Sequence, residues 1–109
     1  MAKKQDQAVL PSLDHFSLSD ASHVYEPSED TYLFCDALYK ERDFLLNQQP
    51  YVALEVGSGS GCVITYLNIL LNENKYHSCL CYSTDINPYA LALTKKTAKL
   101  NNVTLIPLI

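Results

Sequence analysis

The sequence has few basic residues, and this argues against one broad class of partner. Lys and Arg total 8 against 12 Asp and Glu, so the net charge is −4 and the pI is near 5.1. A general nucleic-acid binder carries a basic stripe, so the composition argues against nucleic acid as a partner. Lys95, Lys96 and Lys99 do cluster, but helical spacing projects them from one face as a solubilising surface.

The sequence also lacks a long apolar run. Its longest apolar stretch, residues 63–71, is interrupted by Thr65, Tyr66 and Asn68, and this pattern predicts no membrane span. The basic residues at the N-terminus are not followed by an apolar segment of signal-peptide length. We therefore expect a cytoplasmic protein, with the nucleus as a second compartment.

Cysteines are present, but their spacing does not predict a metal site. Only two of the four, Cys79 and Cys81, are close in sequence, and no second pair stands at zinc-finger spacing. Structural zinc needs four ligands, so we expect no bound metal. Cys35, Cys62 and the close pair are expected to be buried, reduced thiols that act as small apolar side chains.

Composition and pattern divide the chain into two parts. Residues 1–22 are polar without a sustained period, which predicts a flexible N-terminal arm. Residues 23–109 suit an α/β core, because 48% of the chain is hydrophobic and 18% is charged.

Within residues 23–109, helical and strand patterns alternate. This order predicts a parallel sheet with crossover helices. The expected elements are a helix from Ser28 to about Leu46, a strand at Val52–Val56, a helix at Cys62–Leu71, a strand at Cys79–Thr84, a helix capped by Asn87 and ended by Asn101, and a strand that starts at Val103.

The most informative segment is the turn from Glu55 to Gly61. Its three glycines stand at alternate positions, where they allow a sharp strand-to-helix turn and close passage of backbone past a ligand. A dinucleotide site uses the spacing G-x-G-x-x-G, and Glu55 would repel a pyrophosphate. The carboxylate suits a ligand with an ammonium and a sulfonium group instead, and S-adenosylmethionine is such a ligand.

A second acidic residue, Asp85, ends the next predicted strand. At that position a carboxylate can accept hydrogen bonds from both hydroxyls of a ribose. Each acid has a simpler interpretation as well, since Glu55 could be a carboxylate at a loop edge and Asp85 a helix cap. The combination of both acids with the glycine turn is what favours a nucleoside cofactor.

Three segments of the chain resemble one family. They are Val24–Thr31 (Val-Tyr-Glu-Pro-Ser-Glu-Asp-Thr), Leu54–Gly61 (Leu-Glu-Val-Gly-Ser-Gly-Ser-Gly) and Thr84–Pro88 (Thr-Asp-Ile-Asn-Pro). From about residue 24 to the end, the chain is similar to the eukaryotic and archaeal HemK-like glutamine methyltransferases. The first segment is the specific one, because the other two recur in many methyltransferases.

The resemblance implies a fold, a reaction and a set of cofactor contacts. It implies a class I, Rossmann-like, S-adenosylmethionine-dependent methyltransferase with a seven-stranded sheet. Enzymes of this family methylate the glutamine of the Gly-Gly-Gln motif in the class I translation termination (release) factor. By the resemblance, Thr31 would contact the methionine end of S-adenosyl-L-methionine, Glu55, Gly57 and Gly59 would line its middle, and Asp85 would hold the ribose.

The chain departs from the family pattern in what it lacks. The substrate-clamping Asn-Pro-Pro-Tyr motif does not occur in the 109 residues, nor does the acid expected after the third strand. We therefore expect a domain truncated after about its third strand, with no catalytic residue and no activity of its own. The chain would be a fragment, a truncated isoform or an incomplete gene product.

Two other functions stay open at this point. One is an N6-adenine-type nucleic-acid methyltransferase, because the same Asn-Pro-Pro-Tyr chemistry serves adenine amines. The other is a non-catalytic form that occupies the family's partner, a small zinc-binding activator subunit. The resemblance implies that this subunit adds a strand at residues 103–109, an uncharged edge of the sheet. The alternative there is that further polypeptide covers the edge.

Overall fold

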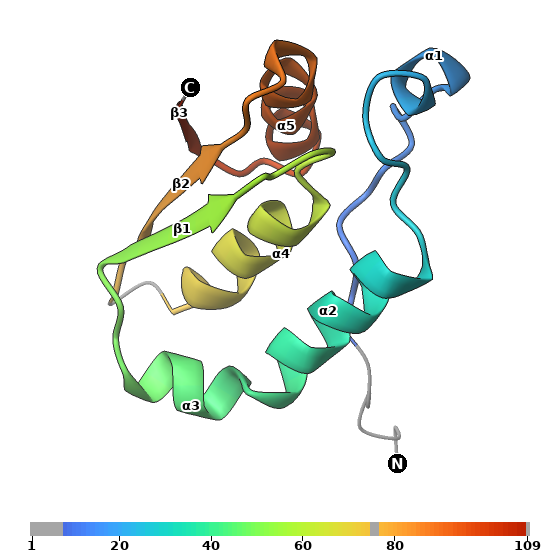
Figure 1. The fold of residues 1–109 in the computed structure, drawn as a ribbon. Coiled ribbons are helices and arrows are strands. Elements are labelled where there is room, and N and C mark those ends of the chain that lie inside the picture. The colour runs from blue at the N-terminus through green and yellow to red at the C-terminus, as the bar shows by residue number, and fades with distance from the viewer. Residues whose placement is uncertain (1–7, 75–76, 109) are drawn as a thin grey trace.

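The computed structural model describes residues 8–74 and 77–108, in which helices alternate with parallel strands (Figure 1). The expected mixed α/β class is thereby confirmed. The elements are α1 (Leu18–Ala21), α2 (Glu29–Lys40), α3 (Arg42–Asn47), β1 (Val52–Val56), α4 (Cys62–Leu71), β2 (Leu80–Thr84), α5 (Pro88–Leu100) and β3 (Ile106–Leu108).

The three strands form one parallel sheet in the order β1-β2-β3. Leu54 pairs with Tyr82, and Tyr82 pairs with Ile106, so these three residues form one row across the sheet. Within the described residues, β1 and β3 each have a strand neighbour on one side only. Both outer edges of the sheet therefore retain unpaired backbone groups.

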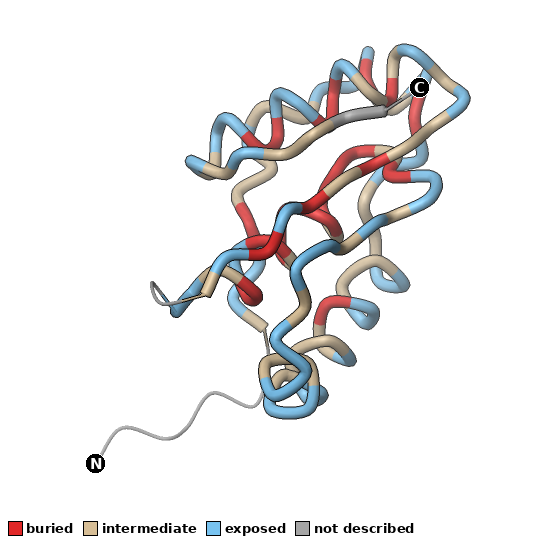
Figure 2. The backbone as a smooth tube through the Cα atoms, turned by 90° about the vertical axis from the view of Figure 1, so that its left-hand side faces the viewer, coloured by how far each residue is buried: buried red, intermediate tan, exposed pale blue. Residues whose placement is uncertain are grey.

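Helix α4 is the centre of the structure. On one side, Ile64 packs with Cys81 of β2, and on the other, Tyr66 packs with Cys35 of α2. Figure 2 shows the buried residues gathered in this interior. A helix that is apolar on most of its circumference needs cover on both sides, and the sheet and α2 provide it.

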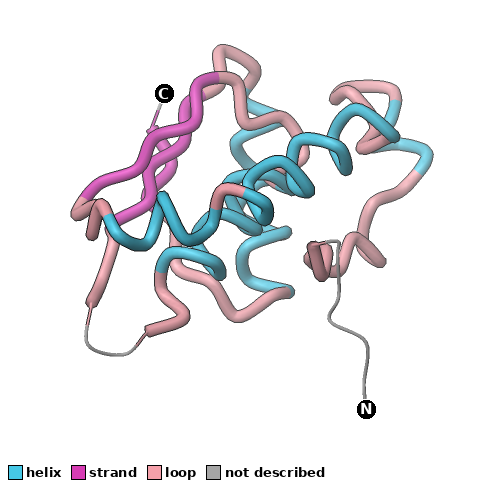
Figure 3. Tube along the Cα trace, turned by 90° about the horizontal axis from the view of Figure 1, so that it is seen from below, coloured by secondary structure: helices cyan, strands magenta, loops and turns pink. Residues whose placement is uncertain are grey.

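The opposite face of the sheet is open. Val52, Leu54 and Val56 are all exposed, with Val56 at 79%, and Leu80 of β2 is exposed as well. Figure 3, seen from below, shows the strands along one side and the helices gathered on the other. The strand residues that alternate with them, such as Cys81 and Ser83, are buried toward the helices.

Residues 8–22, which we expected to belong to a flexible arm, form hydrogen bonds within the segment and to α5. Ser17 and Asp20 form a capping box at α1, and His15 Nε2 lies 2.8 Å from Thr97 Oγ1 of α5. The Ser12 amide donates to Asn101 Oδ1 at 2.7 Å, and the Asn101 amide group donates back to the Ser12 carbonyl at 2.9 Å. These polar side-chain bonds hold the segment without the apolar period that a sequence analysis detects.

The helix expected from Ser28 to about Leu46 is two helices, which is a correction. Glu41 separates α2 from α3 and has φ −93° and ψ 9°, in the bridge region of backbone conformation. Next to it, the Arg42 guanidinium stacks over the Tyr39 ring at 4.0 Å and donates to the Tyr39 carbonyl at 2.8 Å. That side-chain bond satisfies a carbonyl at the end of α2.

The third strand starts at Ile106 and not at Val103, and the second starts at Leu80 and not at Cys79. The Val103 amide donates to the Ala98 carbonyl at 2.9 Å, and the Thr104 carbonyl accepts from Asn68 Nδ2 at 3.0 Å. These groups bond to helices, so pairing with β2 begins only after Leu105.

The four cysteines are free and buried, as expected. Burial raises the pKa of Cys81 to about 12, so its thiol stays protonated at neutral pH. In residues 8–74 and 77–108, no group of three or more His, Cys, Asp or Glu side chains is arranged to hold a metal ion. In the same ranges no helix is long and apolar enough to cross a membrane.

Candidate functional site

The turn between β1 and α4 has a backbone that only glycine adopts easily. Gly57, Gly59 and Gly61 have φ values of +78°, +55° and +83°, in the left-handed region. A side chain at Gly61 would also meet the backbone of α5, since a Cβ there would lie 2.8 Å from Thr94 Cα. The glycine spacing therefore serves both the turn and the close packing of α5 on it.

Two threonines of α5 form hydrogen bonds with the backbone of the turn. Thr94 Oγ1 donates to the Gly59 carbonyl at 3.1 Å and lies 3.0 Å from Ser58 Oγ. Thr97 Oγ1 donates to the Ser60 carbonyl at 2.6 Å. These contacts were not predicted from the sequence, in which their signal is two threonines three positions apart on one helix.

The end of β2 joins the same turn. The Gly57 and Ser58 amides donate to the Thr84 carbonyl at 2.7 and 3.0 Å. Asp85 Oδ2 accepts from the Gly59 amide at 2.9 Å, and Asp85 Oδ1 accepts from the Asn87 amide at 2.9 Å. The structure thus brings Gly57, Gly59 and Asp85 together at the carboxyl ends of two adjacent strands, where open α/β sheets bind ligands.

Glu55, near the turn, has a carboxylate oxygen without a hydrogen-bond partner among the described residues. In the part of the chain that the structure describes, its Oε1 is buried without a hydrogen-bond partner. Burial, with a smaller contribution from the charge of Asp85, raises the pKa of Glu55 to about 7, against a lowering effect of the Ile64 amide. Burial of a carboxylate oxygen without a partner is costly, and a positive charge placed close to Glu55 would offset that cost and lower its pKa.

Thr31, the fifth residue predicted for the site, lies in the first turn of α2. Its Oγ1 accepts from the Ser28 amide at 3.4 Å, and Ser28 Oγ donates to Asp30 Oδ1 at 2.7 Å. Tyr25 Oη donates to the same Asp30 oxygen at 3.1 Å. The segment that carried the family resemblance is therefore a network that starts α2, and a contact of Thr31 with cofactor stays a prediction.

Two hollows open beside the turn. One of about 400 Å³ contains Asp85 in its lining, and one of about 340 Å³ contains Glu55. Both share Val56, so the two acids flank the end of β1. The first hollow is lined by Val56, Gly57, Thr84, Asp85 and Ile86, and the second by Phe34, Leu38, Leu54, Glu55, Val56, Val63, Ile64 and Leu67.

Comparison with known proteins gives a consistent set of relatives, although no protein-family model matches the chain. The chain is 40% identical over 99 residues to Methyltransferase HEMK2 of Homo sapiens, covering 91% of this chain and 44% of that protein. It is 34% identical over 95 residues to the eRF1 methyltransferase catalytic subunit mtq2 of Schizosaccharomyces pombe, covering 84% of this chain and 40% of that protein.

A bacterial protein matches over a shorter range. The chain is 44% identical over 61 residues to the release factor glutamine methyltransferase of Aquifex aeolicus, covering 56% of this chain and 20% of that protein. The chain spans less than half the length of each of these relatives.

Proposed function

Because the chain belongs to the HemK-like methyltransferase family, we propose that it forms the S-adenosylmethionine-binding part of a class I methyltransferase. The proposed substrate is the glutamine of the Gly-Gly-Gln motif in the class I translation release factor. The names of the fission yeast and Aquifex aeolicus relatives support this substrate, because both refer to a release factor. A cytoplasmic location, with the nucleus as a second compartment, is part of the same proposal.

The observation that carries the proposal is the partnerless oxygen of Glu55 beside the glycine turn. S-adenosylmethionine bears an ammonium and a sulfonium group, either of which favours the ionised carboxylate. A ligand phosphate would be repelled by the same group. The charge of the site therefore fits this cofactor better than it fits a dinucleotide.

The other residues of the turn fit the remainder of the cofactor. Asp85 uses one lone pair of each oxygen for Gly59 and Asn87, so both oxygens can still accept from ribose hydroxyls. Gly57 has no heavy atom within 4 Å of where a Cβ would stand, so a ligand can approach its backbone closely. Thr31 is proposed to contact the methionine end.

When bound, the cofactor supplies an electrophilic methyl group, and the residues of this chain only bind and orient it. Positioning of the substrate amide in line with that methyl group needs further residues. Asn-Pro-Pro-Tyr, which would do this in the family, does not occur in the 109 residues. We propose that the 109-residue polypeptide by itself binds the cofactor without transferring its methyl group.

A partner subunit is the second part of the proposal. Strand β3 lies at one side of the sheet in the described residues, with its outer backbone groups available for pairing. A small zinc-binding activator subunit would add a strand there. The fission yeast relative is named a catalytic subunit, which supports a complex of a catalytic subunit with a second subunit.

The test begins with calorimetric titration of the 109-residue chain with S-adenosylmethionine. Binding by the chain and weaker binding by Glu55→Gln are expected, and absence of binding would reject the proposed site. A methyl-transfer assay then uses a polypeptide extended to the length of the relatives. It compares the rate of methyl transfer to purified release factor with the rate of transfer to DNA. Transfer to DNA alone would replace the proposed substrate with the nucleic-acid alternative.

A further inference from the structure

Residues 17–24 cross over from α1 to the glycine turn and to the start of α5. We call this segment, with α1 at its beginning, the N-terminal clasp. It contacts three parts of the proposed cofactor site: the first turn of α5, the cap of that helix and Gly59. The three contacts are made by side chains and backbone groups of different residues.

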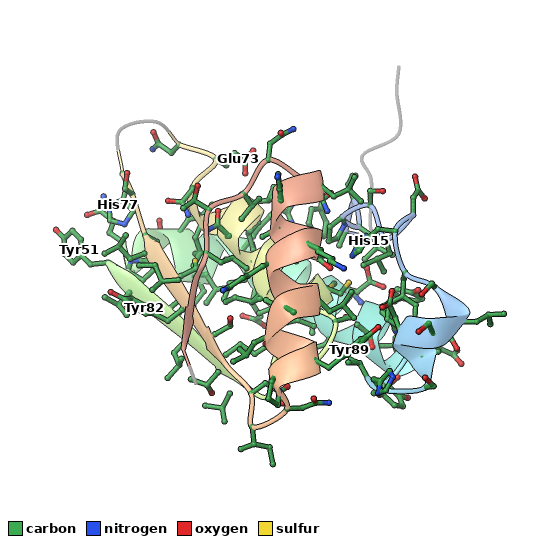
Figure 4. The ribbon with its side chains drawn as sticks, turned by 90° about the horizontal axis from the view of Figure 1, so that it is seen from above. His15, Tyr51, Glu73, His77, Tyr82 and Tyr89 are labelled. Atoms are coloured by element: carbon green, nitrogen blue, oxygen red, sulfur yellow. The ribbon has the colours of Figure 1, made fainter. Side chains whose placement is uncertain are left out.

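The first contact is a hydrogen bond between Tyr89 and Asp20. Tyr89 Oη donates to Asp20 Oδ1 at 2.7 Å, and Asp20 Oδ2 accepts from the Ser17 amide at 2.9 Å. The Tyr89 bond is the largest of the effects that lower the pKa of Asp20. Figure 4 shows Tyr89 between α5 and the blue ribbon of α1, whereas Tyr82 lies on the sheet.

The second contact is made by the backbone that follows. The His23 and Val24 amides donate to the Asp20 carbonyl at 3.0 and 2.9 Å, which fixes the turn after α1. The His23 ring stacks on Tyr89 with centroids 4.3 Å apart. The His23 carbonyl accepts from Asn87 Nδ2 at 2.9 Å, so the clasp holds the capping residue of α5.

The third contact reaches the glycine turn. Val24 is buried together with Ala90 and Leu93 of α5. Its Cγ1 lies 3.7 Å from where a Cβ of Gly59 would stand, so the Val24 side chain forms a wall behind the turn. The amide of Gly59 donates to Asp85, and the amide of Asn87 donates to the same carboxylate.

These contacts form one connected network that includes Asp85. The Tyr89 hydroxyl donates to Asp20, and the Tyr89 amide donates to Asn87 Oδ1. The Asn87 and Gly59 amides both donate to Asp85, and the Val24 side chain lies next to Gly59. We propose that Tyr89, held by Asp20, is a positioning residue that sets the Asp85 carboxylate for the ribose hydroxyls. This inference rests on the proposed cofactor site. It adds a role for the N-terminal segment that the glycine motif does not contain.

The test uses Tyr89→Phe, which removes the hydroxyl and keeps the ring that stacks on His23. Tyr82→Phe is the matched control, because it removes a phenol hydroxyl from the open face of the sheet. Each form of the 109-residue chain is titrated with S-adenosylhomocysteine and with its 2′,3′-dideoxy analogue. Thermal unfolding without ligand confirms that each variant is folded at the temperature of the titration.

Tyr89→Phe is expected to weaken binding of S-adenosylhomocysteine by about three- to tenfold, the scale of one hydrogen bond. Binding of the dideoxy analogue should change far less, because that ligand has no hydroxyls for Asp85 to accept. Tyr82→Phe should leave both affinities unchanged. A general loss of stability would weaken both ligands alike, so the difference between them reports positioning.

Hydrogen exchange gives a second measurement on the same proteins. The His23 and Val24 amides, both bonded to Asp20, should exchange faster in Tyr89→Phe than in the unchanged chain. Equal affinity of Tyr89→Phe and the unchanged chain for S-adenosylhomocysteine would overturn the positioning role alone. Failure of the unchanged chain to bind S-adenosylhomocysteine would overturn the proposed function and this inference with it.

Discussion

The amide of Gly59 donates to the carboxylate of Asp85 at 2.9 Å, across 26 residues of sequence. This bond joins the turn after β1 to the end of β2, so the two motifs found in the sequence form one local structure. Asp85 holds the turn, and under the proposed function it has a second task as an acceptor for the ribose hydroxyls. Experiments that substitute Asp85 must therefore measure the stability of the fold separately from the affinity for ligand.

The first prediction concerns Asp85. Asp85→Ala should lose the bonds to Gly59 and Asn87 as well as those to a ribose, each worth about 1.5–3 kcal/mol at most because the acceptor is charged. Cofactor affinity measured by calorimetry should therefore fall by roughly tenfold or more. Asp85→Asn keeps one acceptor oxygen, so its affinity for cofactor should fall less. Asp43→Ala, in α3, is the exposed control, and an equal loss there would contradict a specific role for Asp85.

The second prediction concerns the charge of Glu55. Its pKa near 7 is raised above the ordinary value for a glutamate, so the ligand-free folded state binds more protons than the unfolded state between about pH 4.5 and 7. The contribution of Glu55 to the free energy of unfolding is fully present below about pH 4.5 and is lost as the pH rises through about 7. At pH 8, Glu55→Gln should therefore stabilise the ligand-free chain by about 1–3 kcal/mol in urea unfolding.

Cofactor binding should show the opposite pH dependence, which makes a third prediction. A cationic ligand favours ionised Glu55, so S-adenosylmethionine should bind more tightly as the pH rises from 6 to 8 and should release protons near pH 7. Calorimetry in buffers of different ionisation enthalpy measures that release. Glu55→Gln should abolish it, and an unchanged proton release in that variant would exclude Glu55 as the source.

The sequence was a good guide where a short segment determines its own structure. The glycine turn and the Asn87-Pro88 start of α5 have local signals, and both were predicted at the residues where the structure has them. The sequence placed Asp85 at the end of the strand beside the turn, but its hydrogen bond with the Gly59 amide was not predicted and is a finding of the structure. The α/β class could be predicted because helical and strand patterns alternate along the chain.

The sequence was a poor guide where distant residues decide. Ser12 is held by Asn101, 89 positions away, and no period in residues 8–22 announces that contact. The start of β3 was misplaced because Asn68 bonds to the Thr104 carbonyl. In each case a polar side chain from another element forms a hydrogen bond with a backbone group, and the spacing of apolar residues does not predict such a bond.

The fourth prediction compares two glycines of the turn. Gly61→Ala puts a Cβ 2.8 Å from Thr94 Cα and imposes a positive φ on a side chain, whereas Gly57→Ala imposes only the positive φ. The strain of the backbone alone costs about 1–2 kcal/mol, and forcing α5 away adds about 1–3 kcal/mol. Urea unfolding should therefore show Gly61→Ala as the less stable variant. Equal stability would mean that α5 can move without cost.

The last prediction concerns the β3 edge and the proposed activator subunit. Leu105 packs against the cluster of Ile64 and Cys81, so a charge there would damage the core and could not report on a partner. Ile106 stands in the open row with Leu54 and Tyr82, and a lysine at this position should disfavour an added strand without entering the core.

Ile106→Lys, in a version extended to the length of the relatives, should therefore lose copurification with the co-expressed activator subunit. Leu80→Lys is the matched control, since it places the same charge on the same open face in β2, one strand away from that edge. The control should copurify normally, and both variants should keep their affinity for cofactor. Normal copurification of Ile106→Lys would mean that the subunit binds elsewhere. Loss in both variants would assign the contact to the open face of the sheet, because only that face is shared by the two positions.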